Sequence, residues 1–213
     1  MTEEQSEKLW NEYLYDNSDV LINKFSCTNF DELKKLEATI TFQKLLELQE
    51  KEIIGNFDKN HLKGIHKYLF DDIYPFAGEY RKVNMAKQRG NFLMMRDIND
   101  IEVYLNELFE RTNNELKNCF NIYQFSEVLS KLYTSLIYCH PFREGNGRTI
   151  REFIREFSIV KSKEIGLGEF ELDWNLINKD ELNKNIEVAH IFPGATTIIF
   201  VKALVDIGNN KKR

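Results

Sequence analysis

The chain has 213 residues, of which 42% are hydrophobic and 30% are charged, a composition typical of a globular protein with an ordinary core. Its net charge of -5 argues against a nucleic-acid footprint, which usually shows as a basic stripe. Three irregularly spaced cysteines, an acidic N-terminus and the lack of a long apolar run indicate no disulfide framework, signal peptide or membrane span. We therefore expect a cytoplasmic protein, or one delivered to a target cell by a route that the sequence does not show.

Most of the chain has the periodicity of amphipathic helices. Only three prolines and ten glycines interrupt it, and apolar residues recur every three or four positions, as in helices that bury one face. The predicted helices are Phe30–Ile54, Asn60–Tyr74, Asp97–Lys117, Asn121–His140, Arg148–Val160, Asp180–Ile191 and Ala195–Ile207.

The segment between the second and third predicted helices has a different texture. Tyr80–Met85 is rich in aromatic and β-branched residues, Gln88-Arg89-Gly90 is typical of a turn, and Asn91–Met95 follows. This pattern predicts a small β-hairpin. Because the chain shows no internal repeat, low-complexity stretch or linker, we expect one all-α domain over residues 1–213, a helical bundle with this hairpin.

The segment that carries chemistry is His140-Pro-Phe-Arg-Glu-Gly-Asn-Gly-Arg-Thr-Ile-Arg151. A helix ends before its proline, and the chain then turns through Gly145 and Gly147. A new helix begins at about Arg148. Glycines before a helix let consecutive backbone N–H groups converge, and the helix dipole adds partial positive charge. The segment therefore predicts an anion site.

The arginines of the new helix strengthen this prediction. We expect Arg148 and Arg151 in its first turn, where cations oppose the helix dipole by roughly 0.3–1 kcal/mol each unless an anion lies over the helix start. Arg155 shares their face, and guanidinium groups suit phosphate oxygens. Taken alone, Arg151 and Arg155 would only form a solvated face paired with Glu152 and Glu156.

Four other residues of the segment indicate phosphoryl chemistry by their combination. Glu144 would repel a phosphate unless a cation lay between them, and Mg²⁺ binds one or two carboxylates together with phosphates. His140 can take a proton from a hydroxyl at neutral pH, and Asn146 can donate its amide to a phosphoryl oxygen. Phe142 is expected in the core below the loop. Each residue has an ordinary structural explanation, and only the conjunction at fixed spacing favours a catalytic loop.

Other nucleotide and metal motifs do not fit. The sequence has no P-loop, and Gly166-Leu-Gly168 lacks the third glycine of a dinucleotide fingerprint. His61 and His66 are five residues apart, which does not match the i, i+4 spacing of a helical metal pair. We interpret them as ordinary surface or core histidines.

The segment resembles the motif of the Fic family, H-x-F-x-[DE]-G-N-G-R-x-x-R. Every defined position matches, and the resemblance extends upstream through Ile65–Arg81, which is similar to the lead into the family's flap hairpin, and Val83–Phe92, which is similar to the flap. Together with the surrounding helices it covers roughly residues 20–205. The matching motif positions are His140, Phe142, Glu144, Gly145, Asn146, Gly147, Arg148 and Arg151.

The resemblance implies a helical Fic fold and nucleotidyl transfer, usually of AMP from ATP to a Tyr, Thr or Ser hydroxyl of a target protein. It makes His140 the base and Glu144 the Mg²⁺ ligand. Gly145, Asn146 and Gly147 become the anion hole, and Arg148 and Arg151 become ligands of the β- and γ-phosphates. The flap turn Lys87–Gly90 (Lys87, Gln88, Arg89 and Gly90) would dock the target's backbone as an added strand. The alternative for the flap is a surface hairpin whose charges only protect an edge.

One departure from the family concerns regulation. Many members carry an inhibitory [ST]-x-x-x-E-[GN]-N pattern, whereas Thr28–Glu32 is followed here by Leu33-Lys34. We expect no self-inhibition through this pattern. The chain could instead be a toxin-like enzyme that a separate antitoxin chain controls. The sequence also leaves open whether it forms a homo-oligomer. The alternatives for activity are transfer of UMP, phosphocholine or phosphate, or a non-catalytic nucleotide-binding module. The resemblance implies that the Doc-like kinases of the superfamily carry lysine in place of the second motif glycine. Gly147 therefore argues against kinase activity.

Overall fold

The computed structural model describes residues 2–89, 91–94, 96–189 and 191–208. Its helices are α1 (Glu3–Asn11), α2 (Phe30–Glu50), α3 (Lys59–Phe70), α4 (Ile101–Leu116), α5 (Ile122–Cys139), α6 (Asn146–Glu164), α7 (Lys179–Val188) and α8 (Thr197–Ala203). Short 3-10 turns precede α4 and α7, η1 (Ile98–Asp100) and η2 (Trp174–Leu176). The strands are β1 (Ala86–Arg89), β2 (Asn91–Met94), β3 (Phe170–Leu172) and β4 (Leu204–Asp206).

The predicted all-α fold with a small hairpin is confirmed, with shifted element ends. The hairpin's first strand is β1, not Tyr80–Met85, so Gln88 and Arg89 belong to the strand and not to the turn. The predicted last helix stops at Ala203, because the chain continues as β4 and pairs with β3 in a second two-stranded sheet. Neither α1 nor this second sheet was predicted. Gly90, Met95 and the tail Asn209–Arg213 lie outside the described residues.

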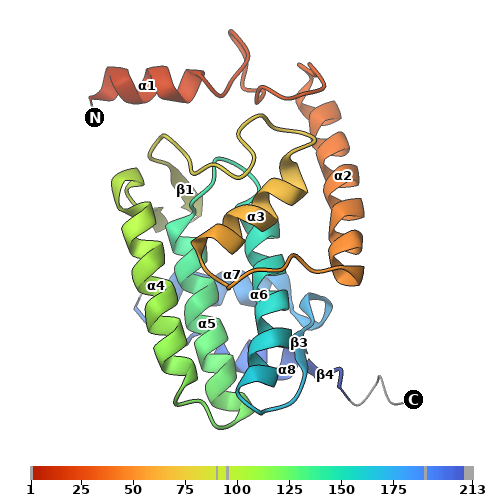
Figure 1. Cartoon of the computed structure of the whole chain (residues 1–213). Coiled ribbons are helices and arrows are strands. Elements are labelled where there is room, and N and C mark those ends of the chain that lie inside the picture. The colour runs from red at the N-terminus through yellow and green to blue at the C-terminus, as the bar shows by residue number, and fades with distance from the viewer. Residues whose placement is uncertain (1, 90, 95, 190, 209–213) are drawn as a thin grey trace.

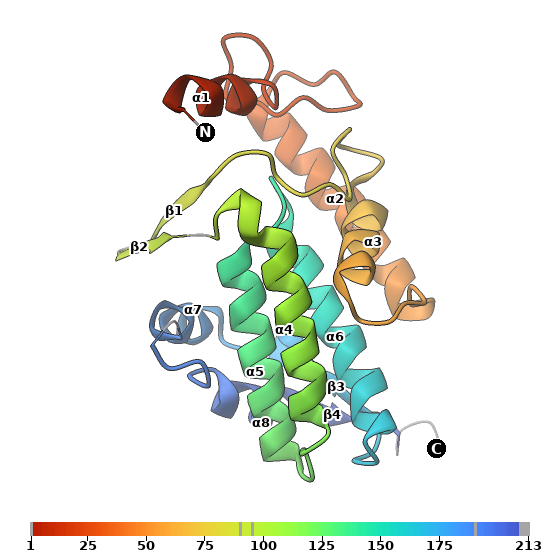
Figure 2. The ribbon, with the colours of Figure 1, turned by 60° about the vertical axis from the view of Figure 1, so that its left-hand side comes forward.

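Helices α4, α5 and α6 run side by side as the central bundle, and α3 packs across α6 (Figures 1 and 2). Helix α2 lies outside α3, while α7, α8 and the β3–β4 sheet cover the other side of the bundle. The centre is filled by large side chains that are almost fully buried, among them Phe70, Phe125, Phe142, Phe153, Phe157 and Phe200. Burial of such aromatic groups is the main favourable term for a fold of this kind.

The loop that joins α5 to α6 lies at one end of the bundle. The N-terminal segment with α1 crosses over this end, and the β1–β2 hairpin projects from it (Figures 1 and 2). Three segments that are far apart in the sequence therefore meet at the predicted catalytic loop.

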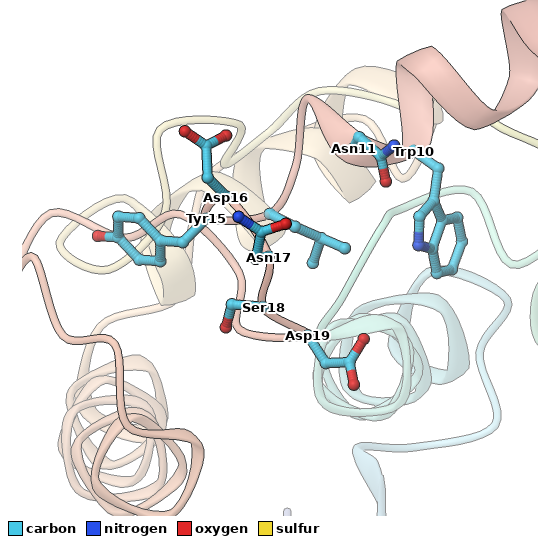
Figure 3. A pocket seen from close by; sticks show the side chains of 8 residues that line it. Trp10, Asn11, Tyr15, Asp16, Asn17, Ser18 and Asp19 are labelled. Carbon is cyan, nitrogen blue, oxygen red and sulfur yellow. The ribbon is translucent and has the colours of Figure 1, made fainter.

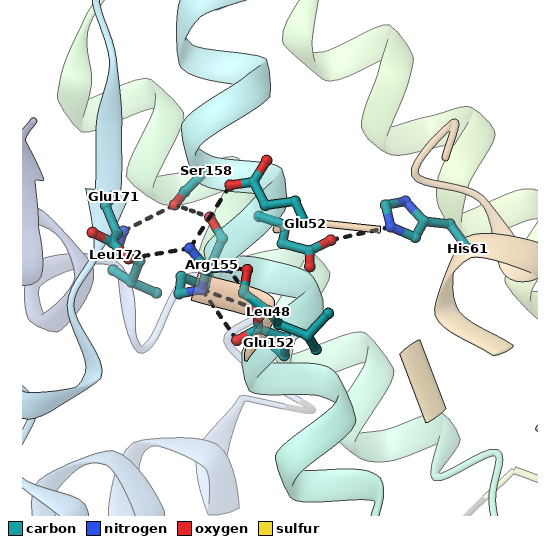
Figure 4. Close-up of polar contacts among 9 residues, drawn as sticks. Leu48, Glu52, His61, Glu152, Arg155, Ser158, Glu171 and Leu172 are labelled. Carbon is teal, nitrogen blue, oxygen red and sulfur yellow. Dashed lines mark hydrogen bonds and ion pairs between the residues drawn. The ribbon is translucent and has the colours of Figure 1, made fainter. Parts of the chain in front are cut away.

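Buried charges gather around the middle of α6, on its flank toward α2, α3 and β3. Arg155 donates to Glu152 at 2.6 Å and to Glu171 at 3.3 Å, and His61 bonds Glu156 at 3.1 Å (Figure 4). Arg155 is therefore not part of a phosphate-facing stripe, and its side chain is buried, not solvated. This cluster joins α6 to its neighbours.

No helix in the described part of the chain combines the length and apolar character that a membrane crossing requires.

Candidate active site

The predicted catalytic loop leaves α5 at His140, the C-cap residue. His140 has φ 47° and ψ 59°, the left-handed region, which costs a non-glycine residue roughly 1–2 kcal/mol. This conformation ends α5 and turns the chain away from the helix axis. The side chain of His140 is half-buried. The structure thus places the predicted base at the junction between α5 and the start of α6.

The loop is anchored from below by aromatic stacking. Phe142 is fully buried, and its ring lies parallel to that of His66 at 3.9 Å between centroids. The expectation that Phe142 anchors the loop in the core is confirmed.

His66 also holds the loop through both of its ring nitrogens. Nδ1 accepts the Gly78 N–H at 2.7 Å, which leaves Nε2 to donate to the carbonyl of Glu144 at 3.0 Å. Only the neutral tautomer with hydrogen on Nε2 can make both bonds. Burial accordingly lowers the pKa of His66 to about 4. His66 is a buried core histidine, as one of the two interpretations had it, and its additional role is to fix the loop.

The side-chain amide of Asn146 bonds the backbone of its own loop. Its Oδ1 accepts the Phe142 N–H at 2.9 Å and its Nδ2 donates to the Phe142 carbonyl at 2.7 Å. The amide therefore closes the loop on itself and is 3% exposed. These bonds use one of the two Nδ2 hydrogens, so donation from Asn146 to a phosphoryl oxygen stays a prediction, and its backbone N–H is a second donor that can serve an anion.

Helix α6 begins with an open N-terminus. Gly145 is its N-cap, and no side chain bonds the first N–H groups, whereas α3 and α5 are capped by Asp58 and Asn121. The first N–H groups of a helix have no intrahelical acceptor. An uncapped start at the junction with the catalytic loop offers them to an anion.

Gly145 and Gly147 lie at this helix start where neighbouring groups leave little room for a side chain. Gly145 has φ 77°, and a Cβ there would come within 2.3 Å of the Phe70 ring. A Cβ at Gly147 would come within 3.3 Å of Nη1 of Arg151. The guanidinium of Arg151 therefore lies back over the helix start, although the residue is in the second turn of α6 and not in the first.

The two motif arginines have different surroundings. Arg148 forms an ion pair with Glu37 and donates to the hydroxyl of Thr41 at 3.1 Å, both on α2. Its guanidinium also lies 4.8 Å from the centroid of the Phe70 ring. Arg151 is exposed. Arg148 is thus oriented by α2 before any ligand arrives, while the guanidinium of Arg151 lies over the helix start.

Glu144 offers one carboxylate beside the open helix start. Its Oε1 accepts the Gly145 N–H at 2.9 Å and lies 3.8 Å from Nη2 of Arg148, and its side chain is 44% exposed. No cluster of three or more metal-ligating side chains occurs among the described residues. A single carboxylate fits Mg²⁺ bound mainly by phosphate oxygens, the usual arrangement for this ion.

The flap lies outside the bundle, and its two strands are antiparallel with Lys87 opposite Leu93 and Gln88 opposite Phe92. Only the backbones of Lys87, Gln88 and Arg89 are described. A short two-stranded hairpin leaves outer N–H and C=O groups for a further strand. Gly90 of the predicted docking turn lies outside the described residues.

The N-terminal segment reaches the catalytic loop through aromatic residues. The guanidinium of Arg143 lies 4.2 Å from the Trp10 ring centroid and 5.5 Å from that of Tyr13. Beyond Trp10 the segment encloses a hollow of about 570 Å³, with Trp10 at one end and Tyr15 at the other (Figure 3). The residues that line it all belong to the segment 10–19. This hollow therefore brings none of the motif residues together.

Sequence reasoning missed three residues that serve this site: Glu37, His66 and Arg81. Arg81 is 3% exposed and its Nε donates to the carbonyl of His140 at 2.8 Å. The only available signal was that His66 and Arg81 lie in the segment Ile65–Arg81, which resembles the lead into the family's flap. Nothing in the spacing of Glu37 connected it with Arg148, which is 111 residues away in sequence.

Comparison with known proteins places this site in a family. The model of the Fic/DOC family matches residues 56–158. The chain is 30% identical over 173 residues to the protein adenylyltransferase VbhT of Bartonella schoenbuchensis, a match that covers 81% of this chain and 34% of that protein. It is 24% identical over 212 residues to the probable protein adenylyltransferase Fic of Escherichia coli, covering 93% and 94% of the two chains. The chain spans about a third of the length of VbhT.

Solved structures agree on the fold. The N-terminal Fic domain of a putative cell filamentation protein from Bartonella quintana, with bound ADP, superposes with a TM-score of 0.81 at 23% identity, covering 95% of this chain and 99% of that one. The BepC protein of Bartonella tribocorum, with bound AMPPNP, has a TM-score of 0.77 at 20% identity and covers 92% and 97%. Residues 56–158 of the chain form a Fic/DOC domain.

Proposed function

We propose that this protein is a protein adenylyltransferase that moves AMP from ATP to a Tyr, Thr or Ser hydroxyl of a target protein, its own chain included. The observation that carries the proposal is the junction of α5 and α6. There a histidine held in the left-handed region adjoins an uncapped helix start with Arg151 folded over it. The similarity to proteins named adenylyltransferases supports AMP as the group transferred.

The reaction follows from this arrangement. The triphosphate lies over the N–H groups of Asn146, Gly147 and Arg148, with the two motif arginines toward its β- and γ-phosphates. The target hydroxyl oxygen attacks the α-phosphorus, and the imidazole of His140 takes its proton. The bond from the α-phosphorus to the bridging oxygen breaks, and pyrophosphate leaves. Negative charge that develops on the phosphoryl oxygens is stabilised by the helix start and Arg151.

Glu144 would hold Mg²⁺ together with the phosphates, and the ion would neutralise charge on the departing pyrophosphate. This assignment rests on the single exposed carboxylate beside the open helix start.

The flap would position the target. An extended target segment would add as a strand to the outer edge of the β1–β2 hairpin, so that backbone hydrogen bonds set its register. The backbone of Lys87–Arg89 is the proposed docking edge.

We propose that the chain needs no removal of an internal glutamate to be active. Glu32, from the pattern that resembled the inhibitory one, contacts Cys27 Sγ at 3.9 Å. Without an internal inhibitory glutamate, the activity would be controlled by a partner, and we propose a separate antitoxin chain.

The decisive experiment labels the ATP at two positions. Incubation with α-³²P-ATP should label protein, including the enzyme itself, and γ-³²P-ATP should not. Label from the γ position would make the protein a kinase, and label from UTP or a phosphocholine donor alone would make it another Fic-type transferase. Nucleotide binding without transfer to any protein of the host proteome would leave a binding module and refute the proposal.

A further inference from the structure

Arg81 is a buried arginine whose side chain contacts the backbone of the catalytic loop at His140. It lies in the segment between α3 and β1, is 3% exposed, and forms no ion pair with a carboxylate of the described chain. Buried arginines are usually paired with a carboxylate. The surroundings of Arg81 therefore require a different explanation from those of Arg155, which is paired with Glu152 and Glu171.

All of the side-chain donors of Arg81 point at backbone or amide oxygens. Nε donates to the carbonyl of His140 at 2.8 Å, and Nη2 donates to that of Cys139 at 3.4 Å. Its backbone N–H donates to the carbonyl of Pro141 at 2.9 Å. Arg81 thus holds three consecutive carbonyls at the end of α5, where helix carbonyls lack intrahelical partners and carry partial negative charge.

The same guanidinium also holds both ends of the flap. Nη1 donates to the carbonyl of Val83 at 2.8 Å and to Oδ1 of Asn84 at 3.4 Å, just before β1. Nη2 donates to the carbonyl of Arg96, just after β2. An arginine has five N–H donors in a planar fork, and here every one of them has an acceptor.

We propose that Arg81 is a positioning residue that fixes the backbone of His140 relative to the two ends of the flap. The inference rests on the proposed function for its consequence: a target strand laid on the flap keeps its hydroxyl in register with the base. The left-handed conformation of His140 persists only where its surroundings determine it, and the bond from Arg81 Nε to the His140 carbonyl supplies such a constraint. Lysine could not replace it, because an ammonium group lacks the planar fork.

The first test compares Arg81→Lys with Arg155→Lys. Both arginines are buried, at 3% and 6% exposure, so both variants lose thermal stability. Arg81→Lys should slow self-labelling from α-³²P-ATP by about 10²-fold, the loss that a misplacement near 1 Å can cause, while AMPPNP affinity stays within about threefold because the helix start is untouched. Arg155→Lys, assayed well below its melting temperature, should label at nearly the wild-type rate. Equal rates in the two variants would overturn the inference.

The second test does not depend on activity. Backbone amide hydrogen exchange should become faster across β1, β2 and the loop after α5 in Arg81→Lys and unchanged there in Arg155→Lys. If the wild type transfers no AMP, the proposed function fails and this exchange measurement still decides about Arg81. Unchanged exchange at the flap and loop would show that Arg81 does not couple them.

A third variant covers the case in which Arg81→Lys does not fold. Asn84 accepts from the Ile98 N–H at 2.9 Å and donates to Asp97 at 2.7 Å, so it ties the flap ends beside Arg81. Asn84→Ala should speed amide exchange in the flap and lower self-labelling without changing AMPPNP affinity. If flap exchange in this variant equals that of the wild type, the flap ends are not held as proposed.

Discussion

The start and the middle of helix α6 use charge in opposite ways. At the start, the helix is uncapped, Arg151 is exposed, and the arginines there can meet a ligand. In the middle of the helix, Arg155 is paired with Glu152 (Figure 4), and Glu156 is paired with His61. Charged residues that stabilise the fold form ion pairs with other buried residues of the chain. Charged residues that we expect to bind a substrate are either without such a buried pair or, like Arg148, are oriented by an ion pair with a neighbouring helix.

From this comparison we expect the largest loss of transfer rate from a substitution at His140, just before the start of α6. His140→Ala should lower AMP transfer by about 10²–10⁴-fold, the range for a lost general base. ATP affinity should stay near that of the wild type, because the phosphates bind the helix start. Rates of α-³²P labelling and AMPPNP titration measure the two quantities. An equal loss of transfer and of affinity would show that His140 is structural.

A second prediction concerns the pH dependence of stability at the site end. His66 is held neutral with a pKa of about 4 against 6.5 for a free histidine, so the unfolded chain binds a proton between these pH values and the folded chain does not. Its contribution to stability is complete above pH 6.5 and is lost as the pH falls toward 4. A pKa shift of one unit corresponds to about 1.36 kcal/mol, so His66 should lower the free energy of unfolding by about 3 kcal/mol between pH 7 and pH 4.

The measurement for this prediction is denaturant unfolding of the wild type and of His66→Gln at pH 7 and at pH 4. The variant should be less stable at pH 7 and should lose about 3 kcal/mol less than the wild type on acidification. The same slope in both proteins would mean that His66 is not kept neutral by the fold, and the loop would need another anchor.

How much of this site the sequence could predict depends on the range of the interactions. The motif and the helix break at Gly145 are local, so spacing and residue type were enough to predict an anion site. The partners of Asn146 are also local, yet the sequence could not tell whether its amide faces a ligand or Phe142. Glu37 and Arg81 act across 111 and 59 residues of sequence, and only the packing of α2 and the flap ends onto the loop brings them to it.

The fold shows the same division. Amphipathic periodicity predicted α2 to α8, because each helix buries a face that recurs every three or four residues. Helix α1 was missed because it contains few apolar residues, Leu9 and Trp10. Strand β4 was missed because the apolar run from Ala195 to Ile207 fits one continuous helix equally well. Pairing with β3 decides the matter, and that pairing is non-local.

A third prediction uses two glycines with the same backbone conformation. Gly145 and Gly166 have φ of 77° and 79°, but an added Cβ at Gly145 meets the Phe70 ring, whereas at Gly166 it meets nothing within 4 Å. Both alanine variants incur the left-handed penalty of about 1–2 kcal/mol. Gly145→Ala should lose a further 1–3 kcal/mol or so from overpacking, measured as the difference in unfolding free energy. Equal losses would mean that the Phe70 ring moves aside freely.

The smallest predicted effect concerns the preset arginine. Glu37 on α2 pairs with Arg148 and also accepts the hydroxyl of Tyr74. Glutamine at position 37 could accept from Arg148 through its oxygen and donate its amide to the Tyr74 oxygen, which reverses that bond, while removing one negative charge near the phosphates. Glu37→Gln should therefore bind AMPPNP more tightly by about 2–10-fold at low salt, in line with roughly 1 kcal/mol for a partly screened charge, and the gain should shrink as salt rises.

The matched control for Glu37→Gln is Glu47→Gln on the same helix. Glu47 likewise accepts a tyrosine hydroxyl, that of Tyr68 at 2.6 Å, but it forms no ion pair with Arg148. Its variant should leave AMPPNP affinity unchanged, and so should Glu32→Gly, which removes a carboxylate whose described contact is Cys27. Weaker binding in Glu37→Gln would mean that the ion pair orients Arg148 for the phosphates and that orientation outweighs charge. A large rise in activity on removing Glu32 would instead reveal an inhibitory contact and contradict the proposal that the chain is active as it stands.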